Sequence, residues 1–281
     1  MCVPALFLFF LFVVIPIIMG LQISFTDWNG YSQGYSFVGL ENYREMVHDQ
    51  AVHLAFRNTL IYGFGSTLIQ VVLGLSLALL LCKAFLLRTI TRTLVYIPAM
   101  VAQIVVGYIW YFIFSYERGA LNDVVKLFGM APVDWLAKGT RAVLIITLIN
   151  SIEYCGKAMV IFIAGLEAIP NMYQEAAEID GANGWQVFKH ITVPMLLPAF
   201  NTALVLNIIG GLKMFGLVLS LTDGGPGYAS HSLSSLINTM YFANQRAGYS
   251  AAIGVFSFLF IMFVSIVLRR YMEHKDRQYN G

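Results

Sequence analysis

The chain has 281 residues, of which 58% are hydrophobic and 11% are charged, and its formal net charge is +2. Soluble domains carry about a quarter charged residues, so water is not the main solvent of this protein. The small net charge and the lack of a basic run interleaved with aromatic residues exclude nucleic acid as a partner. The cysteines are far apart and show no metal-binding spacing, so neither a disulfide framework nor a metal site is predicted; they are Cys2, Cys82 and Cys155.

Apolar runs long enough to cross a hydrocarbon core of about 30 Å predict an all-α polytopic membrane protein with six transmembrane helices in one domain, residues 1–281. In chain order the spans lie near residues 3–23, 59–82, 94–114, 142–165, 195–220 and 250–268. The first run lacks a basic leader and a cleavage signature of small residues, so it is interpreted as a span and not as a signal peptide. Because it begins without basic residues, we also expect a short native segment to precede it.

Six spans place both termini on one side of the membrane, and lysine and arginine are densest in the segments that would be cytoplasmic. The basic residues of the short second connection and of the tail are Lys83, Arg88, Arg92, Arg269, Arg270, Lys275 and Arg277. The opposite connections, residues 24–58, 115–141 and 221–249, carry nearly as many basic residues, but over longer stretches and mixed with acids. Both termini are therefore predicted to be cytoplasmic.

The fourth connection, residues 166–194, has the pattern of two short helices separated by a glycine. Pro170 ends the preceding span, Asn171 can cap the next turn, and Gly181 stands where a left-handed helix stop is needed. Small side chains before that glycine leave room for another protein, and acidic side chains there offer it hydrogen-bond acceptors. Trp185 follows the glycine and is a large apolar side chain that another surface is expected to cover. The alternative interpretation is an amphipathic loop that lies along the membrane surface.

Three features of this connection follow one another at fixed spacing: Glu175-Ala176-Ala177, then Gly181 after three residues, then Ile191-x-x-Pro194 after nine more. This pattern resembles the EAA loop of the inner-membrane permease subunits of binding-protein-dependent ABC importers, with Val193 in place of the usual leucine. Further segments, residues 37–43, 58–60 and 221–226, resemble the carbohydrate-uptake branch and are similar to the maltose and glycerol-phosphate permeases. The resemblance covers nearly the whole chain.

The resemblance implies the type I ABC importer permease fold. It also implies that the chain lies in a bacterial cytoplasmic membrane and contacts membrane lipid. It implies contact between the EAA loop and an ATPase through Glu175, Ala176, Ala177, Glu178, Asp180, Gly181, Trp185 and Pro194. It also implies a second homologous permease, two copies of the ATPase, a carbohydrate substrate, and an extracytoplasmic sugar-binding protein that docks near Asp223, Gly224, Gly225 and Pro226. ATP and Mg would be bound by the ATPase subunits, and no cofactor is expected on this chain.

Ionisable groups inside a span are costly unless they are paired or face water. Glu153 and Lys157 lie four residues apart in the fourth span, a spacing that fits an ion pair on one helix face, and this structural role stays open beside a role in transport. Sugars need amide, carboxylate and aromatic groups, and the resemblance places the path on the fourth to sixth spans. The candidate path residues are Asn150, Glu153, Tyr154, Lys157, Asn207, Gly211 and Lys213, with Gln103, Trp110 and Tyr111 as further candidates.

The sequence has no phosphate-binding GxxxxGK[ST] loop and no HExxH or GxSxG motif, so ATP hydrolysis is expected on another polypeptide and the chain is expected to be non-catalytic. A neutral oligosaccharide is favoured over a polyol phosphate, because the candidate path has no arginine pair to bind a phosphate. The alternatives are import of such a non-sugar solute, an ion-coupled secondary transporter, and a membrane enzyme or scaffold. Against the secondary transporter stand the missing chain of intramembrane carboxylates and the lack of a visible inverted repeat.

Overall fold

A computed structural model describes residues 3–82 and 86–280 of the chain. Cys2 and Lys83 lie outside the described residues, as do the side chains of Lys275 and Arg277. The described helices are α1 (Val3–Phe9), α2 (Ile15–Ile23), α3 (Glu41–His48), α4 (Gln50–Leu60), α5 (Ser66–Cys82), α6 (Arg88–Tyr96), α7 (Gln103–Phe114), α8 (Ala120–Leu127), α9 (Gly139–Glu167), α10 (Asn171–Ile179), α11 (Gly184–Val187), α12 (Val193–Met195), α13 (Leu197–Leu212), α14 (Gly216–Thr222), α15 (Leu233–Asn238) and α16 (Ala247–Asn280).

Four continuous helical segments in the described part of the chain are long and apolar enough to cross a membrane: Val3–Ile23, Gln50–Cys82, Gly139–Glu167 and Ala247–Met272. Short π-helical segments join α1 to α2 and α4 to α5 without a break. Two bent helix pairs bring the number of spans to six if each pair is one span. They are Arg88–Met100 with Gln103–Phe114, bent by 96°, and Gly184–Met195 with Leu197–Leu212, bent by 61°.

The third span differs from the single helix predicted over residues 94–114. The α6 helix continues into a 3₁₀ turn, Ile97–Met100, and the chain is extended at Val101 before α7 begins. Pro98 lies in this turn. Because proline has no backbone N–H and its ring clashes with the preceding turn of an α-helix, it favours a break at this position.

The fifth and second predicted spans also have different bounds in the structure. The α13 helix ends at Leu212, and α14 is a separate short helix, so the single helix predicted over residues 195–220 is wrong. The second span begins nine residues earlier than predicted, at Gln50 instead of residue 59. The side chain of Asp49 accepts a hydrogen bond from Ala51 N at 2.8 Å and caps this early start.

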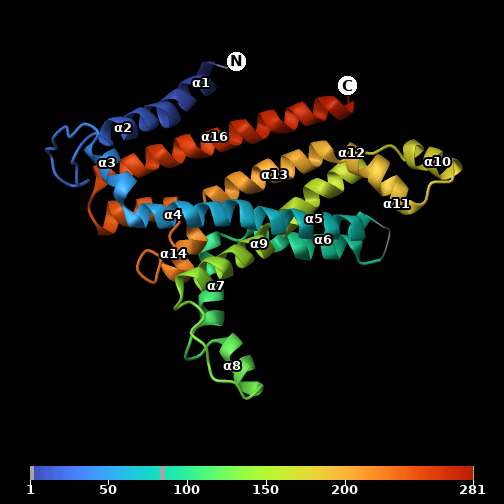
Figure 1. Ribbon diagram of the computed structural model, residues 1–281, viewed down its shortest axis with the longest axis horizontal. Coiled ribbons are helices and arrows are strands. Elements are labelled where there is room, and N and C mark those ends of the chain that lie inside the picture. The colour runs from blue at the N-terminus through green and yellow to red at the C-terminus, as the bar shows by residue number, and fades with distance from the viewer. Residues whose placement is uncertain (1–2, 83–85, 281) are drawn as a thin grey trace.

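The helices are arranged along one long direction, with different connections at the two ends (Figure 1). The α10 and α11 helices lie at one end, and the α2–α3 connection and α14 lie toward the other. The α16 helix runs beside α2 and toward the end that carries α10 and α11. The α8 helix projects from the body. The molecule therefore has two distinct ends that a membrane would separate.

The α5 and α9 helices pack against each other along their length and position the polar residues described below. Gly74 of α5 lies at the crossing, where an added Cβ would be 2.7 Å from the Cβ of Ala158. Absence of a side chain at Gly74 lets the two backbones approach closely, as is common in membrane helices. Buried residues around this crossing, among them Met159 and Phe162, form a core that continues onto α13.

Candidate functional site

The connection between α9 and α12 folds into the two short helices expected from the sequence. The α10 helix begins directly after Pro170, and Asn171 is its first residue with no side-chain cap, so the prediction that Asn171 caps this helix is wrong. Proline at that position already fixes the backbone dihedral that leads into the helix. Gly181 follows α10 with φ of 81°, the left-handed conformation predicted for it. Asn183 caps α11 in a reciprocal capping box with Gln186.

Most of the residues predicted to contact an ATPase are exposed at the α10–α11 end. Glu175, Ala176, Glu178, Asp180, Gly181 and Trp185 are exposed, and Ala177 and Pro194 are half-buried. The Trp185 side chain is 69% exposed, with its ring centroid 5.6 Å from that of Phe188. Ile179, at 86% exposure, was not among the predicted residues and adds to this apolar surface. A cavity of about 340 Å³ separates the two short helices and is lined by Ala177, Asp180, Gly181, Ala182, Gln186, Val187, His190 and Ile191.

Arg92 on α6 ties the start of this connection to α5. Its Nη2 donates to the carbonyl oxygen of Leu81 at 3.0 Å and to Oε1 of Glu167 at 3.1 Å. Leu81 lies in the last turn of α5, and Glu167 is the last residue of α9. One guanidinium therefore holds together the ends of two helices. Sequence reasoning missed this contact, because Arg92 and Glu167 are separated by 75 residues.

A polar pocket of about 220 Å³ lies between α5, α9 and α13, with the first residue of α7 also in its lining, and it contains most of the predicted path residues. It is lined by Gln70, Gln103, Asn150, Tyr154, Lys157, Leu206, Asn207, Gly210 and Gly211. Four of the nine carry carboxamide groups. Gln70 comes from the second span and was not a candidate, although a glutamine inside an apolar run is a usable signal.

The amide groups of this pocket are partly unpaired. Gln70 Nε2 donates to the carbonyl oxygen of Asn150 at 3.0 Å. The Oε1 atom of Gln70 and the Nδ2 atom of Asn207 have no hydrogen-bond partner among the described residues, although both side chains are buried. Leaving a buried polar group unpaired costs free energy. The two unpaired groups are one acceptor and one donor, and both are shielded from solvent in this conformation.

The predicted ion pair between Glu153 and Lys157 is wrong. Glu153 is buried, and neither of its carboxylate oxygens has a hydrogen-bond partner in the part of the chain that the structure describes. Lys157 is exposed and extends over the ring of Tyr154, with Nζ 5.9 Å from the ring centroid, so a cation–π contact replaces the ion pair. Glu153 and Lys213 do not line the pocket, and Lys213 is exposed just after α13. Of the further candidates, Trp110 and Tyr111 also lie elsewhere.

At the opposite end, the segment from Asp223 to Pro226 follows α14. Asp223 and Pro226 are exposed, Gly225 is half-buried and Gly224 is buried. Residues of the second span hold the chain just beyond this turn: Asn58 Nδ2 donates to the carbonyl oxygens of Ala229 and His231, at 2.8 and 3.1 Å, and Tyr62 Oη donates to that of Ser230 at 2.8 Å. Residues 58–62 are thereby linked to residues 229–231, and Ser230 in turn contacts the turn itself, because its N donates to the carbonyl oxygen of Gly224 at 3.0 Å and its Oγ to that of Gly225 at 2.7 Å.

His231 lies beneath this turn and is almost completely buried. Its Nδ1 is 2.9 Å from Oγ of Ser235. Burial lowers the pKa of the imidazole below its ordinary value, and the nearby carboxylate of Asp223 opposes this shift. The neutral imidazole is therefore the form that the folded protein favours.

Comparisons with known proteins identify relatives over nearly the full length. A family model described as "Binding-protein-dependent transport system inner membrane component" matches residues 70–277. The probable starch degradation products transport system permease protein AmyD of Thermoanaerobacterium thermosulfurigenes is 33% identical over 94% of this chain and 89% of its own length. The trehalose/maltose transport system permease protein MalF of Thermococcus litoralis is 32% identical over 95% and 90%.

One solved structure shows the same arrangement of helices. It is the crystal structure of a bacterial alginate ABC transporter in complex with an alginate pentasaccharide-bound periplasmic protein. The match has a TM-score of 0.80 and 23% sequence identity, and it covers 98% of this chain and 92% of that one.

Proposed function

Because the chain belongs to the family of binding-protein-dependent transport system inner membrane components, we propose that it is the permease subunit of an ATP-driven importer that carries a neutral oligosaccharide. It has the type I ABC importer permease fold, shared with the alginate transporter. In this proposal residues 1–281 form one transmembrane domain in a bacterial cytoplasmic membrane. Relatives named for starch degradation products and for trehalose and maltose support carbohydrate as the substrate class.

The observation that carries the substrate class is the polar pocket between α5, α9 and α13. Its four carboxamides and the Tyr154 hydroxyl can donate to and accept from sugar hydroxyls. Among the residues that the structure describes, Lys157 is the only charged side chain that lines it, and no arginine does. A single flexible ammonium does not form the bidentate contacts that favour phosphate binding. The pocket thus supports a neutral sugar over a polyol phosphate.

Coupling to ATP in this proposal occurs at the α10–α11 end. Exposed apolar groups such as Trp185 and Ile179, beside the carboxylates of Glu175 and Glu178, offer a surface for an ATPase subunit. ATP can drive a conformational change only through contacts that differ between two states. The chain itself is proposed to be non-catalytic, with ATP and Mg held by the partner.

The complete importer would contain this chain, a second homologous permease, two copies of the ATPase and an extracytoplasmic binding protein. The binding protein would dock near Asp223 and Pro226, at the end remote from α10 and α11. Both termini would be cytoplasmic, on the side of the ATPase.

Uptake by a reconstituted importer tests this proposal. Vesicles that contain both permeases, the ATPase and trapped ATP, with binding protein outside, should accumulate labelled maltotriose. The substitution Glu175→Ala should reduce this uptake strongly.

The alternatives predict other results. Excess glycerol phosphate should not compete with maltotriose, and competition would favour a polyol phosphate as the substrate. Uptake that needs no ATP and is abolished by a proton ionophore would establish a secondary transporter. Lack of any solute flux would favour the enzyme or scaffold interpretation.

A further inference from the structure

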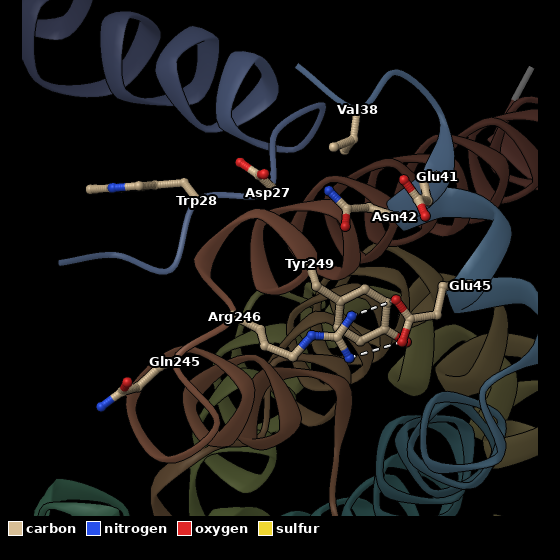
Figure 2. Close-up of a pocket in the computed structure, with 9 residues that line it drawn as sticks. All are labelled: Asp27, Trp28, Val38, Glu41, Asn42, Glu45, Gln245, Arg246 and Tyr249. Atoms are coloured by element: carbon tan, nitrogen blue, oxygen red, sulfur yellow. Dashed lines mark hydrogen bonds and ion pairs between the residues drawn. The ribbon is translucent and has the colours of Figure 1, made fainter. Parts of the chain in front are cut away.

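A second pocket, unrelated to the candidate path, lies at the end of the molecule remote from α10 and α11. It has a volume of about 230 Å³ and is formed by the α2–α3 connection, α3, the two residues that precede α16 and the first turn of α16 (Figure 2). Its lining residues are Asp27, Trp28, Val38, Glu41, Asn42, Glu45, Gln245, Arg246 and Tyr249. This set combines segments about 200 residues apart in the sequence.

Hydrogen bonds across the pocket hold these segments together. Arg246 and Glu45 form a bidentate ion pair, and the guanidinium carbon of Arg246 is 4.3 Å from the ring centroid of Tyr249. Tyr249 Oη donates to Oδ2 of Asp49 at 2.6 Å, and Gly248 N donates to the carbonyl oxygen of Trp28 at 2.8 Å. The pocket is therefore preorganised and does not need to be assembled by a ligand.

The pocket is acidic. Three carboxylates line it, those of Asp27, Glu41 and Glu45, against the single guanidinium of Arg246. Both carboxylate oxygens of Glu45 pair with Arg246, whereas the carboxylate of Glu41 has no ion-pair or hydrogen-bond partner among the described residues. Asp27 Oδ1 accepts a hydrogen bond from Ser36 N at 2.6 Å, and its Oδ2 accepts none from the described residues. Within the described part of the chain, the carboxylates of Asp27 and Glu41 are left without a paired cation.

An amide oxygen is presented beside these two carboxylates. Asn42 is 7% exposed, and its Nδ2 donates to the carbonyl oxygens of Ser24 at 2.9 Å and Thr26 at 2.8 Å. These two bonds fix the orientation of the amide. Its Oδ1 atom, which accepts no hydrogen bond from the described residues, lies on the pocket side (Figure 2). An accessible acceptor on an amide held in this way favours a ligand with hydrogen-bond donors.

We propose that this pocket binds a lysine side chain of the extracytoplasmic binding protein. An ammonium has three donors and no acceptor, which matches the acceptors of Asp27, Glu41 and Asn42. Trp28 and Val38 provide apolar surface for its methylene stem. A guanidinium suits the pocket less, because its bidentate fork needs two free oxygens of one carboxylate, and both oxygens of Glu45 and one of Asp27 are already engaged. No group of three His, Cys, Asp or Glu in the described residues is placed to hold a metal ion.

The choice of partner rests on the proposed function and on position. The pocket lies toward the same end as the turn at Asp223–Pro226, where the binding protein is proposed to dock. A lysine inserted here would extend that contact across the end of the molecule to α3 and α16. The amine of a phosphatidylethanolamine headgroup has the same chemistry, so the test uses membranes without this lipid.

The test is the stimulation of ATP hydrolysis by the cognate binding protein, with the whole importer in nanodiscs of phosphatidylcholine and phosphatidylglycerol. The double variant Asp27→Asn with Glu41→Gln should raise the half-saturating concentration of binding protein about tenfold, as expected for loss of a partly buried charge contact. The effect should become smaller as salt increases. Glu117→Gln, an exposed acid on another outer connection, should change nothing.

Carbodiimide coupling provides a second measurement, because it joins a carboxylate directly to an adjacent amine. A cross-linked peptide should join residues 24–44 to a lysine of the binding protein, and the double variant should lose it. An unchanged half-saturating concentration together with no such cross-link would overturn the lysine assignment. An effect restricted to discs with phosphatidylethanolamine, or thermal stabilisation by calcium alone that the double variant loses, would also overturn it. Lack of any stimulation in the unaltered importer would instead refute the proposed function.

Discussion

Gly224 and His231 are in direct contact beneath the turn that follows α14. An added Cβ at Gly224 would overlap the imidazole ring, which is buried and cannot move away easily. Gly227, three residues later, also has a positive φ, 59° against 77° at Gly224, but has open space where its Cβ would be. The two positions therefore separate the cost of backbone conformation from the cost of steric overlap.

Alanine substitutions at these two glycines should differ in their effect on stability. Gly227→Ala carries only the left-handed backbone penalty, about 1 kcal/mol. Gly224→Ala adds the displacement of a packed ring, for a total of about 3 kcal/mol. Thermal unfolding of the purified chain in detergent should show a clearly lower midpoint for Gly224→Ala. Equal midpoints would mean that His231 is not packed against this glycine.

Burial of His231 also predicts a pH dependence of stability. Because the folded state holds the pKa of this imidazole below its ordinary value, the unfolded state binds the proton more readily. Stability should be unaffected by this group above the ordinary pKa of about 6.5 and should fall as the pH drops below it. His231→Asn keeps a polar atom near Ser235 and does not titrate. Its unfolding midpoint should fall less than that of the unaltered chain between pH 7.5 and 5.5, and parallel curves would contradict the assignment.

The link from Arg92 to Leu81 and Glu167 belongs to the scale of whole helices. Both ion-pair partners are partly exposed, with side-chain exposures of 23% for Arg92 and 56% for Glu167. Such a pair contributes at most about 1 kcal/mol to stability. Its position matters more, because Glu167 is followed within four residues by α10, the first helix of the proposed ATPase contact. Motion of that contact would reach α5, and hence Gln70, through this guanidinium.

Breaking this link should impair coupling more than folding. Arg92→Ala should lower ATP-driven uptake by about fivefold, the size of a modest coupling free energy, with little change in thermal stability. Exchange of the two charges, Arg92→Glu with Glu167→Arg, should recover part of the uptake. Asp123→Asn breaks the comparable exposed pair with Lys126 on α8 and should have no effect. If Arg92→Ala transports normally, the link has no role in coupling.

Several path residues could be predicted from the sequence because they are polar groups within apolar spans. Asn150, Tyr154 and Lys157 recur at intervals of four and three residues, which places them on one face of α9, and Asn207 and Gly211 follow the same rule on α13. Gln70 was missed because its orientation depends on the α5–α9 crossing at Gly74, a contact between distant segments. Proline within an apolar run is tolerated in many membrane helices, so the bend at Pro98 was not distinguishable from a straight span.

At the scale of the whole molecule, the two ends differ in the surfaces that they present to partner proteins. The end with α10 and α11 exposes Trp185 and Ile179, whereas the other end carries the acidic pocket and the turn at Asp223. The polar pocket lies between them, against α5, α9 and α13. This arrangement fits a path between two compartments, provided that the α10–α11 end is cytoplasmic.

That orientation can be measured by thiol labelling. In a background with all three cysteines replaced by serine, single cysteines are introduced at Gln33, in the α2–α3 connection, and at Met172 on α10; both positions are exposed. A membrane-impermeant maleimide should label Gln33→Cys but not Met172→Cys in right-side-out vesicles, and both after permeabilisation. The expectation follows from the dense basic residues of the second connection and the tail, which favour the cytoplasmic side. Labelling of Met172→Cys alone in sealed vesicles would invert the topology and remove α10 from reach of a cytoplasmic ATPase.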